Sequence, residues 1–168
     1  VSGPRGSPEN LPESHRRLVA VRPEGDVTAI DAARRNLTPL LRRAFRRPVT
    51  AEDVEPYATL VQSALDRGES FERAMQVGLQ AVLVSPQFLF RVETPGTDEW
   101  TGSSVPISAV ELASRLSYFL WSSCPDDPLL DAAAAGRLRQ SEGLTREVRR
   151  LLADPRARTF SEQFAGQW

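Results

Sequence analysis

The residues that could carry chemistry in this chain are few and widely separated. The sequence holds a single histidine, His15, and a single cysteine, Cys124. Covalent attachment of haem c requires a Cys-x-x-Cys-His motif, and structural zinc requires about four Cys or His ligands. Because neither set can be assembled from one residue of each type, we expect no metal ligand and no cofactor-binding residue within this chain.

His15 is the one residue that could act as a general base in a Ser-His-Asp or Cys-His arrangement. It falls within residues 1–17, a stretch rich in Pro, Gly, Ser and charge that is typical of a linker. A solvated histidine is the simpler interpretation, so the sequence indicates no catalytic residue. The sequence also lacks the Gly-rich loops with which nucleotide-binding proteins hold phosphate groups.

Asp126 and Asp127 are a conspicuous pair of adjacent carboxylates. Such a pair could do acid–base work if one member kept its proton at neutral pH. Pro128 follows directly, and an Asp before a Pro commonly begins a helix, which explains the pair without chemistry. Three aromatic residues near Cys124 could line a small pocket, although aromatic residues at a helix end more often belong to the core: Tyr118, Phe119 and Trp121.

Arginine supplies all 21 basic residues of the sequence, and pairs of it recur at 34/35, 42/43 and 46/47. A guanidinium group matches phosphate or sulfate bidentately. Arg35, Arg42 and Arg46 are therefore the candidates for a site that binds an anion or a sulfated glycan. The alternative is a solvated helix face whose charge is balanced by nearby acidic residues.

Composition limits the classes of protein to which the chain can belong. It has 168 residues, 40% of them apolar and 26% charged, which is ordinary for a globular protein able to bury a core. The net charge is −1 and the sequence pI is about 5.9, so we expect no general attraction to nucleic acid. No run approaches the roughly 18 consecutive apolar residues of a membrane span.

Helical periodicity covers most of the first half of the chain. The spacing predicts a helix over residues 29–45, and Pro39 on its polar side is expected to kink it or to start a new helix. Arg35, Arg42 and Arg46 should lie opposite its apolar stripe, which consists of Leu37, Leu40, Leu41, Ala44 and Phe45.

Two further helices are predicted between residues 50 and 84. Thr50 and Asp53 indicate the start of the first, and Gly68 indicates its end. Ser70 opens the second, which is apolar around most of its circumference and should be the most buried of this half. After it comes an apolar run that is expected to anchor the chain in the core: Phe88, Leu89 and Phe90.

The second half opens on a capping box, in which the side chains of Ser108 and Glu111 each accept from the other residue's backbone amide. The helix that follows should bury Ala109, Leu112, Ala113, Leu116, Phe119 and Leu120. A short helix is predicted from Asp126 or Asp127 to Gly136, and Asp154 should begin the last helix. A helix between them is marked by Leu144, Val148, Leu151 and Leu152.

These elements predict an all-α protein of two small packed helical subdomains, with about six or seven helices after a short extended N-terminal segment. Residues 1–26 are assigned to a linker and, at Leu18–Val21, to the last strand of an upstream domain. Residues 27–95 are predicted to form the first helical domain and residues 104–168 the second. We expect the second domain to continue beyond Trp168.

Several runs of this sequence resemble those of a known family: Phe45–Thr50, Ser85–Glu93, Ser108–Glu111, Arg115–Ser123, Leu151–Ala157 and Phe164–Trp168. The pattern is similar to that of two adjacent domains of unknown function in large proteins of planctomycetes and related bacteria. It covers roughly residues 15–168. In such proteins a carbohydrate-binding-like β domain precedes the two domains, and a c-type cytochrome domain commonly lies elsewhere in the polypeptide.

The resemblance implies an exported, multi-domain protein, in the periplasm, at the cell envelope or secreted, of which this chain is an internal segment. Its partners would be neighbouring domains of the same polypeptide, carbohydrate would bind through the upstream domain, and haem c would lie outside this chain. Many members carry two cysteines, at positions that correspond to the neighbourhood of Val21 and Ala32, and this chain has neither. We therefore expect the junction between strand and first helix to be held by packing alone.

Three functions are compatible with these residues and this resemblance. The first is a non-catalytic helical scaffold within a large exported protein. The second is the helical part of a haem-dependent redox enzyme whose cytochrome domain lies outside this chain. The third is an anion- or sulfated-glycan-binding module that uses Arg35, Arg42 and Arg46. The first is favoured, because the chain offers amphipathic helices for packing and no evident reactive cleft.

Overall fold

The structure, a computed structural model, describes residues 12–90 and 107–166, and every regular element within these ranges is a helix. The prediction of an all-α protein is confirmed. The chain divides into two compact units, the first made of Val1–Leu41 with Val49–Ser85 and the second of Arg42–Pro48 with Pro86–Trp168. None of the helices in the described part combines the length and the apolar character that crossing a membrane requires.

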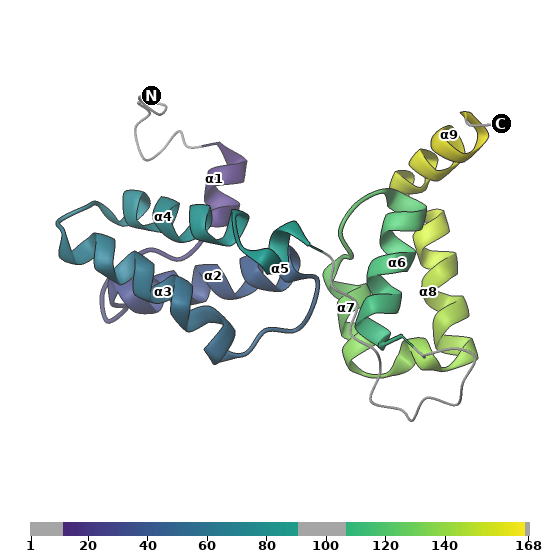
Figure 1. Cartoon of the computed structure of the whole chain (residues 1–168), viewed down its shortest axis with the longest axis horizontal. Coiled ribbons are helices and arrows are strands. Elements are labelled where there is room, and N and C mark those ends of the chain that lie inside the picture. Colours follow the sequence, from purple (N-terminus) through teal and green to yellow (C-terminus); the bar gives the residue numbers. More distant parts are fainter. Residues whose placement is uncertain (1–11, 91–106, 167–168) are drawn as a thin grey trace. The chain divides into compact units, whose positions relative to one another are not determined.

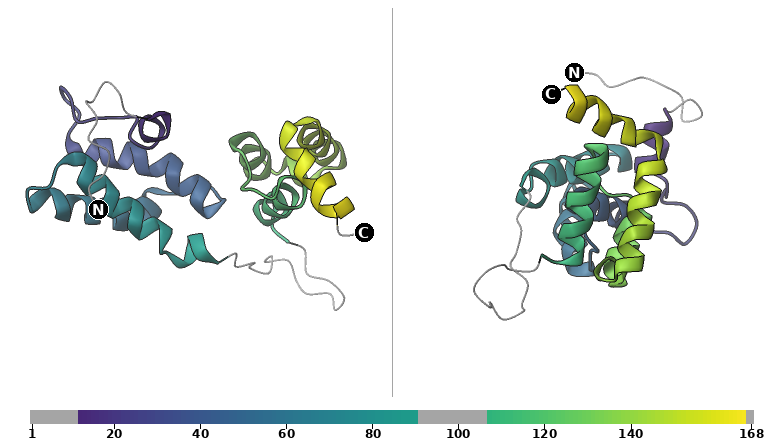
Figure 2. Two further views of the ribbon diagram at one scale, coloured as in Figure 1. Left: turned by 90° about the horizontal axis from the view of Figure 1, so that it is seen from above. Right: turned by 90° about the vertical axis from the view of Figure 1, so that its right-hand side faces the viewer.

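The first unit consists of α1 (Glu13–Leu18), most of α2 (Ala29–Phe45), α3 (Ala51–Asp66) and α4 (Phe71–Leu83). α3 packs along α4, and α1 runs crosswise to the long helices (Figures 1 and 2). α2 continues through Pro39, where a kink or a new helix was expected. The core lies among the three long helices, and its fully buried residues include Leu37, Leu41, Ala58, Val61, Ala64, Ala74 and Val82.

Local signals place the ends of these helices as predicted. Thr50 precedes α3, and its backbone N–H donates to the Asp53 carboxylate across 2.9 Å. The side chain of Ser70 accepts a hydrogen bond from the backbone N–H of Arg73 at the start of α4. Gly68 follows α3 with a φ of 82°, a left-handed conformation that glycine adopts without strain.

A buried amide ties the segment before α2 to that helix. The side chain of Asn36 accepts a hydrogen bond from the backbone N–H of Val21 at 2.9 Å and donates one to its carbonyl at 2.7 Å. The amide thereby satisfies both backbone groups of Val21, as a neighbouring strand would. The expectation that packing alone holds this junction is wrong, because a polar side chain of the first long helix binds the backbone directly.

The N-terminal stretch differs from the prediction in a second way. Residues Glu13–Leu18, which were assigned mainly to a linker, form α1, and Leu18 ends this helix instead of beginning a strand. Residues 19–21 form neither a helix nor a strand. His15 lies on α1 with its Nε2 shielded from solvent, so the expectation of a solvated histidine is wrong. The reason is that this short helix lies beside α2 and α4.

The second unit contains α5 (Pro86–Leu89), α6 (Ala109–Trp121), α7 (Asp127–Ala134), α8 (Ser141–Ala153), α9 (Arg158–Gly166) and the 3₁₀ turns η2 (Arg137–Arg139) and η3 (Pro155–Ala157). Figures 1 and 2 show α6 and α8 side by side. The buried core comprises Ala113, Leu120, Trp121, Leu129, Ala132, Ala133, Leu138 and Leu151.

The predicted starts of α6 and α7 are confirmed. The backbone N–H of Ser108 donates to the Glu111 carboxylate at 2.8 Å, and the N–H of Glu111 donates to the Ser108 hydroxyl at 3.1 Å. Asp126 caps α7, and Gly136 follows the end of that helix with a φ of 70°. These ends are set by residues close in sequence, which explains why the sequence predicts them.

The buried face of α6 differs from the predicted stripe. Phe119 is 60% exposed, whereas Ser117 is fully buried and Leu120 is 5% exposed. The Ser117 hydroxyl donates to the carbonyl of Ser114 at 3.1 Å, so this hydroxyl is buried without an unmet hydrogen bond. Ala113 and Leu120 are buried as predicted, so the predicted stripe is wrong at Phe119, and it left out the buried Ser114, Ser117 and Trp121.

The apolar run after α4 is also less buried than predicted. Leu89 is 59% exposed and Phe90 is 63% exposed, so the expectation that both anchor the chain in the core is wrong. α5 spans only one turn, Pro86–Leu89, and it is held through its backbone carbonyls, as described below. Leu152 on α8 is likewise exposed.

Gly143 marks a very close approach within the second unit. A Cβ at this position would lie 2.2 Å from the backbone carbonyl oxygen of Arg137 in η2. Backbone atoms cannot turn aside as a flexible side chain can, so the first turn of α8 reaches this position only with glycine.

Gly143→Ala should therefore lower the free energy of unfolding by roughly 1–3 kcal/mol, although alanine is the better helix former. Gly166→Ala is the matched control, because a Cβ there would meet nothing within 4 Å. It should leave the free energy of unfolding unchanged or raise it by up to about 1 kcal/mol. Urea unfolding followed by circular dichroism measures both, and equal effects would contradict the close approach.

Two adjacent residues of α6 test which face is buried. Leu120→Ala should lower the free energy of unfolding by about 2–5 kcal/mol, because it leaves a cavity in the core. Phe119→Ala should cost about 0.5–1.5 kcal/mol, because Phe119 mainly loses its contact with the ring of Phe160, whose centroid lies 5.0 Å away. If chemical unfolding showed the larger loss for Phe119→Ala, Phe119 and not Leu120 would be the more buried of the two residues.

Candidate functional site

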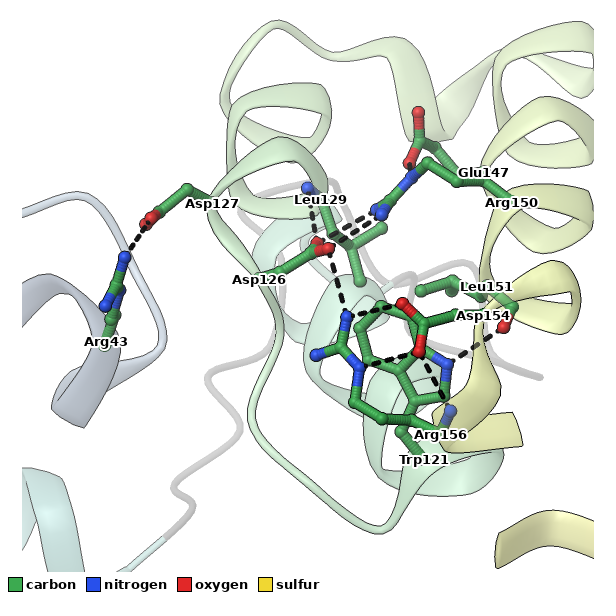
Figure 3. A network of polar contacts seen from close by, with 10 residues as sticks. All are labelled: Arg43, Trp121, Asp126, Asp127, Leu129, Glu147, Arg150, Leu151, Asp154 and Arg156. Atoms are coloured by element: carbon green, nitrogen blue, oxygen red, sulfur yellow. Dashed lines mark hydrogen bonds and ion pairs between the residues drawn. The ribbon is translucent and has the colours of Figure 1, made fainter. Parts of the chain in front are cut away.

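The carboxylate of Asp126 is the centre of the polar network in the second unit (Figure 3). It accepts a hydrogen bond from the backbone N–H of Leu129 at 3.1 Å, which caps α7. Its two oxygens also accept from Arg150 on α8, at 2.7 and 2.9 Å, in a bidentate ion pair. One side chain thus joins the start of α7 to the last turns of α8.

Two further carboxylates complete the pairing of the arginines in this network (Figure 3). Glu147 accepts from the Nε of Arg150 at 2.8 Å. Asp154 accepts from the Nε and Nη2 of Arg156 at 2.9 and 2.8 Å, and from the backbone N–H of the same residue at 2.9 Å. Arg156 also lies 3.7 Å from the Asp126 carboxylate. The network therefore connects α7, α8 and η3.

Trp121 at the end of α6 forms the apolar side of the network (Figure 3). The guanidinium carbon of Arg156 lies 3.5 Å from the ring centroid, the distance of a close cation–π contact. The indole N–H of the buried Trp121 donates to the carbonyl of Leu151 at 2.9 Å. α6 is thereby bound to the same charged residues as α7 and α8.

The electrostatics of this network favour the ionised form of two of its carboxylates, Asp126 and Asp154. Partial burial would raise the pKa of Asp126, but the hydrogen bonds from Arg150 and from the Leu129 N–H, with the charges of Arg150 and Arg156, lower it on balance. Hydrogen bonds from Arg156 lower the pKa of Asp154 to about 2. A carboxylate with a lowered pKa is a poor proton donor at neutral pH. The network joins α7, α8 and η3 through charge-assisted hydrogen bonds.

The adjacent carboxylates Asp126 and Asp127 do not act on a common site. Asp126 faces Arg150, whereas Asp127 accepts from Arg43 at 2.6 Å (Figure 3). The interpretation of this pair as a helix start is confirmed, since Asp126 caps α7 and Pro128 lies in its first turn. The pairing with Asp127 raises the pKa of Arg43.

The three candidate anion-binding residues occupy different environments. Arg35 is exposed on the part of α2 that belongs to the first unit. Arg42 forms ion pairs with Asp131 and, at 3.9 Å, with Asp127, all within the second unit. Arg46 is only 7% exposed, so its predicted place on a solvated helix face is wrong. For Arg42 and Arg46 the guanidinium groups are directed to protein oxygens, and anion binding stays a prediction.

Arg46 instead binds the turn that follows α4. Its Nη2 donates to the backbone carbonyls of Gln87 and Phe90 at 2.9 and 3.2 Å. Arg46 has a φ of 57°, and the backbone N–H of Arg47 donates to the carbonyl of Arg42, which together end α2 in a Schellman motif. Glycine usually occupies such a left-handed position, because a side chain there adds strain. At Arg46 the hydrogen bonds from the guanidinium to backbone carbonyls offset this strain.

This contact was missed from the sequence, although a signal for it was present. The runs Phe45–Thr50 and Ser85–Glu93 were already the most distinctive of the chain. The structure brings part of each together, since Arg46 comes from the first run and its carbonyl partners from the second. An arginine was assigned to a solvated face by its helical position, but it lies just past the end of the helix and turns inward.

Tyr118 and Cys124 form a second polar contact in this unit. The phenol oxygen lies 3.3 Å from the Cys124 sulfur. Burial, together with the hydrogen bond to Cys124, raises the pKa of Tyr118, and the charge of Arg46 partly opposes this. Within the described residues, no three His, Cys, Asp or Glu side chains come together in a way that could hold a metal ion.

Comparison with protein families identifies both halves of the chain. Residues 32–93 match PSD5, described as a protein of unknown function (DUF1595), and residues 107–168 match PSD4, described as a protein of unknown function (DUF1592). The chain carries a PSD5 domain followed by a PSD4 domain. The resemblance to two adjacent domains of unknown function is thereby confirmed. No curated protein and no solved structure was found that matches the chain.

Two groups of polar contacts each lie within one match, whereas Arg42 and Arg43 of the PSD5 match pair with Asp131 and Asp127 of the PSD4 match. The Asp126 network, from Trp121 to Arg156, lies entirely within the PSD4 match. Arg46 and the carbonyls that it binds lie entirely within the PSD5 match. Each domain of the chain therefore has a buried or partly buried arginine that binds elements distant in sequence.

The lowered pKa of Asp126 predicts how stability depends on pH. In the unfolded chain an aspartate has a pKa of about 3.9, so the unfolded state takes up the proton first as the pH falls. The stabilisation by ionised Asp126 is fully present above about pH 5 and is lost as the pH falls through the folded-state pKa.

Asp126→Asn should therefore flatten the fall in the free energy of unfolding between about pH 5 and pH 2.5, besides lowering it at pH 7. Asp26→Asn, at an exposed position before α2, is the control and should leave the profile unchanged. Urea unfolding at a series of pH values measures both. An unaltered slope in Asp126→Asn would show that the ion pair does not lower this pKa.

Proposed function

We propose that the PSD5 and PSD4 domains of this chain form a non-catalytic helical scaffold within a larger exported protein. The observation that carries the proposal is the Asp126 network, in which each carboxylate is paired with an arginine and the pKa values of Asp126 and Asp154 are lowered. Acid–base catalysis is favoured by a pKa near the working pH, and carboxylates whose pKa is lowered are poor acids and weak bases. Asp126, which the sequence offered as part of a possible acid–base pair, instead joins helices in this network.

The scaffold role also agrees with how the arginines are used. Arg150 joins α8 to α7, and Arg156 joins η3 to Trp121 on α6. Arg46 holds α5 by its carbonyls. These contacts fix helices relative to one another within a unit. A domain that holds neighbouring domains of the polypeptide in place needs this rigidity. Export, and carbohydrate binding through an upstream domain, belong to the same proposal and rest on the family resemblance.

One observation favours a second candidate, the helical part of a haem-dependent redox enzyme. Phe119 on α6 is largely exposed, although its ring packs against that of Phe160 on α9. Leu152 on α8 is exposed as well. Exposed aromatic residues of this kind are common where another domain docks. A cytochrome domain elsewhere in the polypeptide could use this surface.

The full-length protein that contains this chain distinguishes the two candidates. Phe119→Ser should leave its haem content and its rate of haem reduction unchanged if the domains are a scaffold. Leu60→Ser is the matched control, because Leu60 is a similarly exposed apolar residue on α3 of the first unit. A fall in the reduction rate of about tenfold or more in Phe119→Ser alone, with unchanged circular dichroism, would favour the redox role and refute the scaffold.

A further inference from the structure

The first unit contains a cavity of about 300 Å³ between α1, α2 and α4. Its walls are mainly apolar: Leu18 and Val19 border it at the end of α1, Leu40 on α2, and Met75 and Leu79 on α4. The volume equals that of about ten water molecules and falls within the range of small-molecule sites. Water in such a space finds few hydrogen-bond partners, so an apolar molecule that displaces it gains free energy.

The polar groups at this cavity carry no unpaired charge. Glu72 accepts from Arg22 at 2.6 Å, so its carboxylate is neutralised. The side-chain oxygen of Gln76 accepts from Arg73 at 3.0 Å. A charged ligand would lose its hydration without gaining a free counter-charge, and an uncharged ligand is therefore favoured.

Ser14 and His15 supply the remaining polar side chains, and His15 is the one with a ring. It borders the cavity from α1, and its Nε2 is shielded from solvent with no hydrogen-bond partner in the part of the chain that the structure describes. A shielded ring nitrogen without a partner is uncommon in folded proteins and unfavourable. Because Nε2 is shielded from the cavity as well, a molecule in the cavity would lie beside the imidazole ring without bonding to this nitrogen.

We propose that this cavity, a half-open pocket, is a binding site for a small, uncharged and largely apolar molecule that packs against the ring of His15. The three helices line the apolar body of the ligand, and the imidazole ring borders it. This site is independent of the scaffold proposal, because it lies in the first unit and the scaffold argument rests on the second.

The probe for the test is N-phenyl-1-naphthylamine, an uncharged aromatic amine whose fluorescence rises in apolar surroundings. The 168-residue chain should bind it saturably with a stoichiometry of one. Leu79→Trp fills the cavity and should raise the Kd about tenfold or more. Leu83→Trp, on the same helix, is the matched control, because Leu83 is 44% exposed and does not border the cavity. It should leave the Kd unchanged.

His15 provides a second measurement that needs no core substitution. Because it is the sole histidine of the chain, its imidazole resonances in an NMR spectrum are unambiguous. Saturation with the probe should shift them, because the aromatic rings of the bound probe lie beside the imidazole. The proposal is overturned if the chain does not bind the probe, if Leu79→Trp binds it as tightly as the control, or if bound probe leaves the His15 resonances unmoved.

Discussion

The bidentate ion pair between Asp126 and Arg150 is the interaction on which the second unit depends. It joins the first turn of α7 to α8, and the same carboxylate lies close to Arg156, whose guanidinium covers the ring of Trp121. Removing one member of a partly buried pair leaves the other without a partner, which costs more than the pair itself contributes. The network therefore acts as a unit: the positions of α6, α7, α8 and η3 are coupled through a few side chains. With Asp126, the carboxylates of Glu147 and Asp154 surround the guanidinium groups of Arg150 and Arg156, so each of the two arginines is paired.

The absence of lysine from the sequence has a structural counterpart in how arginine is used. Arg150 needs a planar fork to bind two carboxylate oxygens at once, and Arg156 needs a flat cation to lie against an indole ring. Arg46 uses one guanidinium nitrogen to bind two backbone carbonyls, that of Gln87 in α5 and that of Phe90 directly after it. A lysine ammonium could make one of these contacts at a time but not the set. At these positions the arginines bind the protein itself, which is a different use from the anion binding that their pairing in the sequence suggested.

The sequence predicted the features that depend on neighbouring residues and missed those that depend on distant ones. Helix starts at Thr50, Ser108 and Asp126 were predicted correctly, because a cap and the amides it binds lie within one turn. The exposed side of Phe119 and the buried position of Arg46 were missed, because each is decided by elements far away in the chain. The polar network was present in the sequence only as isolated Asp and Arg residues, and nothing in their spacing indicated that they meet. The same holds for the cavity at His15, which requires α1 to lie against α2 and α4.

The amide of Asn36 has a consequence for when and where the chain can fold. Relatives of this pattern were expected to close the same junction through two cysteines, and a disulfide needs an oxidant and time to form. The two hydrogen bonds between Asn36 and Val21 need neither. They involve no thiol, so a reducing environment leaves them as stable as an oxidising one, and thiol reagents cannot open them. The connection between this segment and α2 is thus insensitive to the redox state of its surroundings.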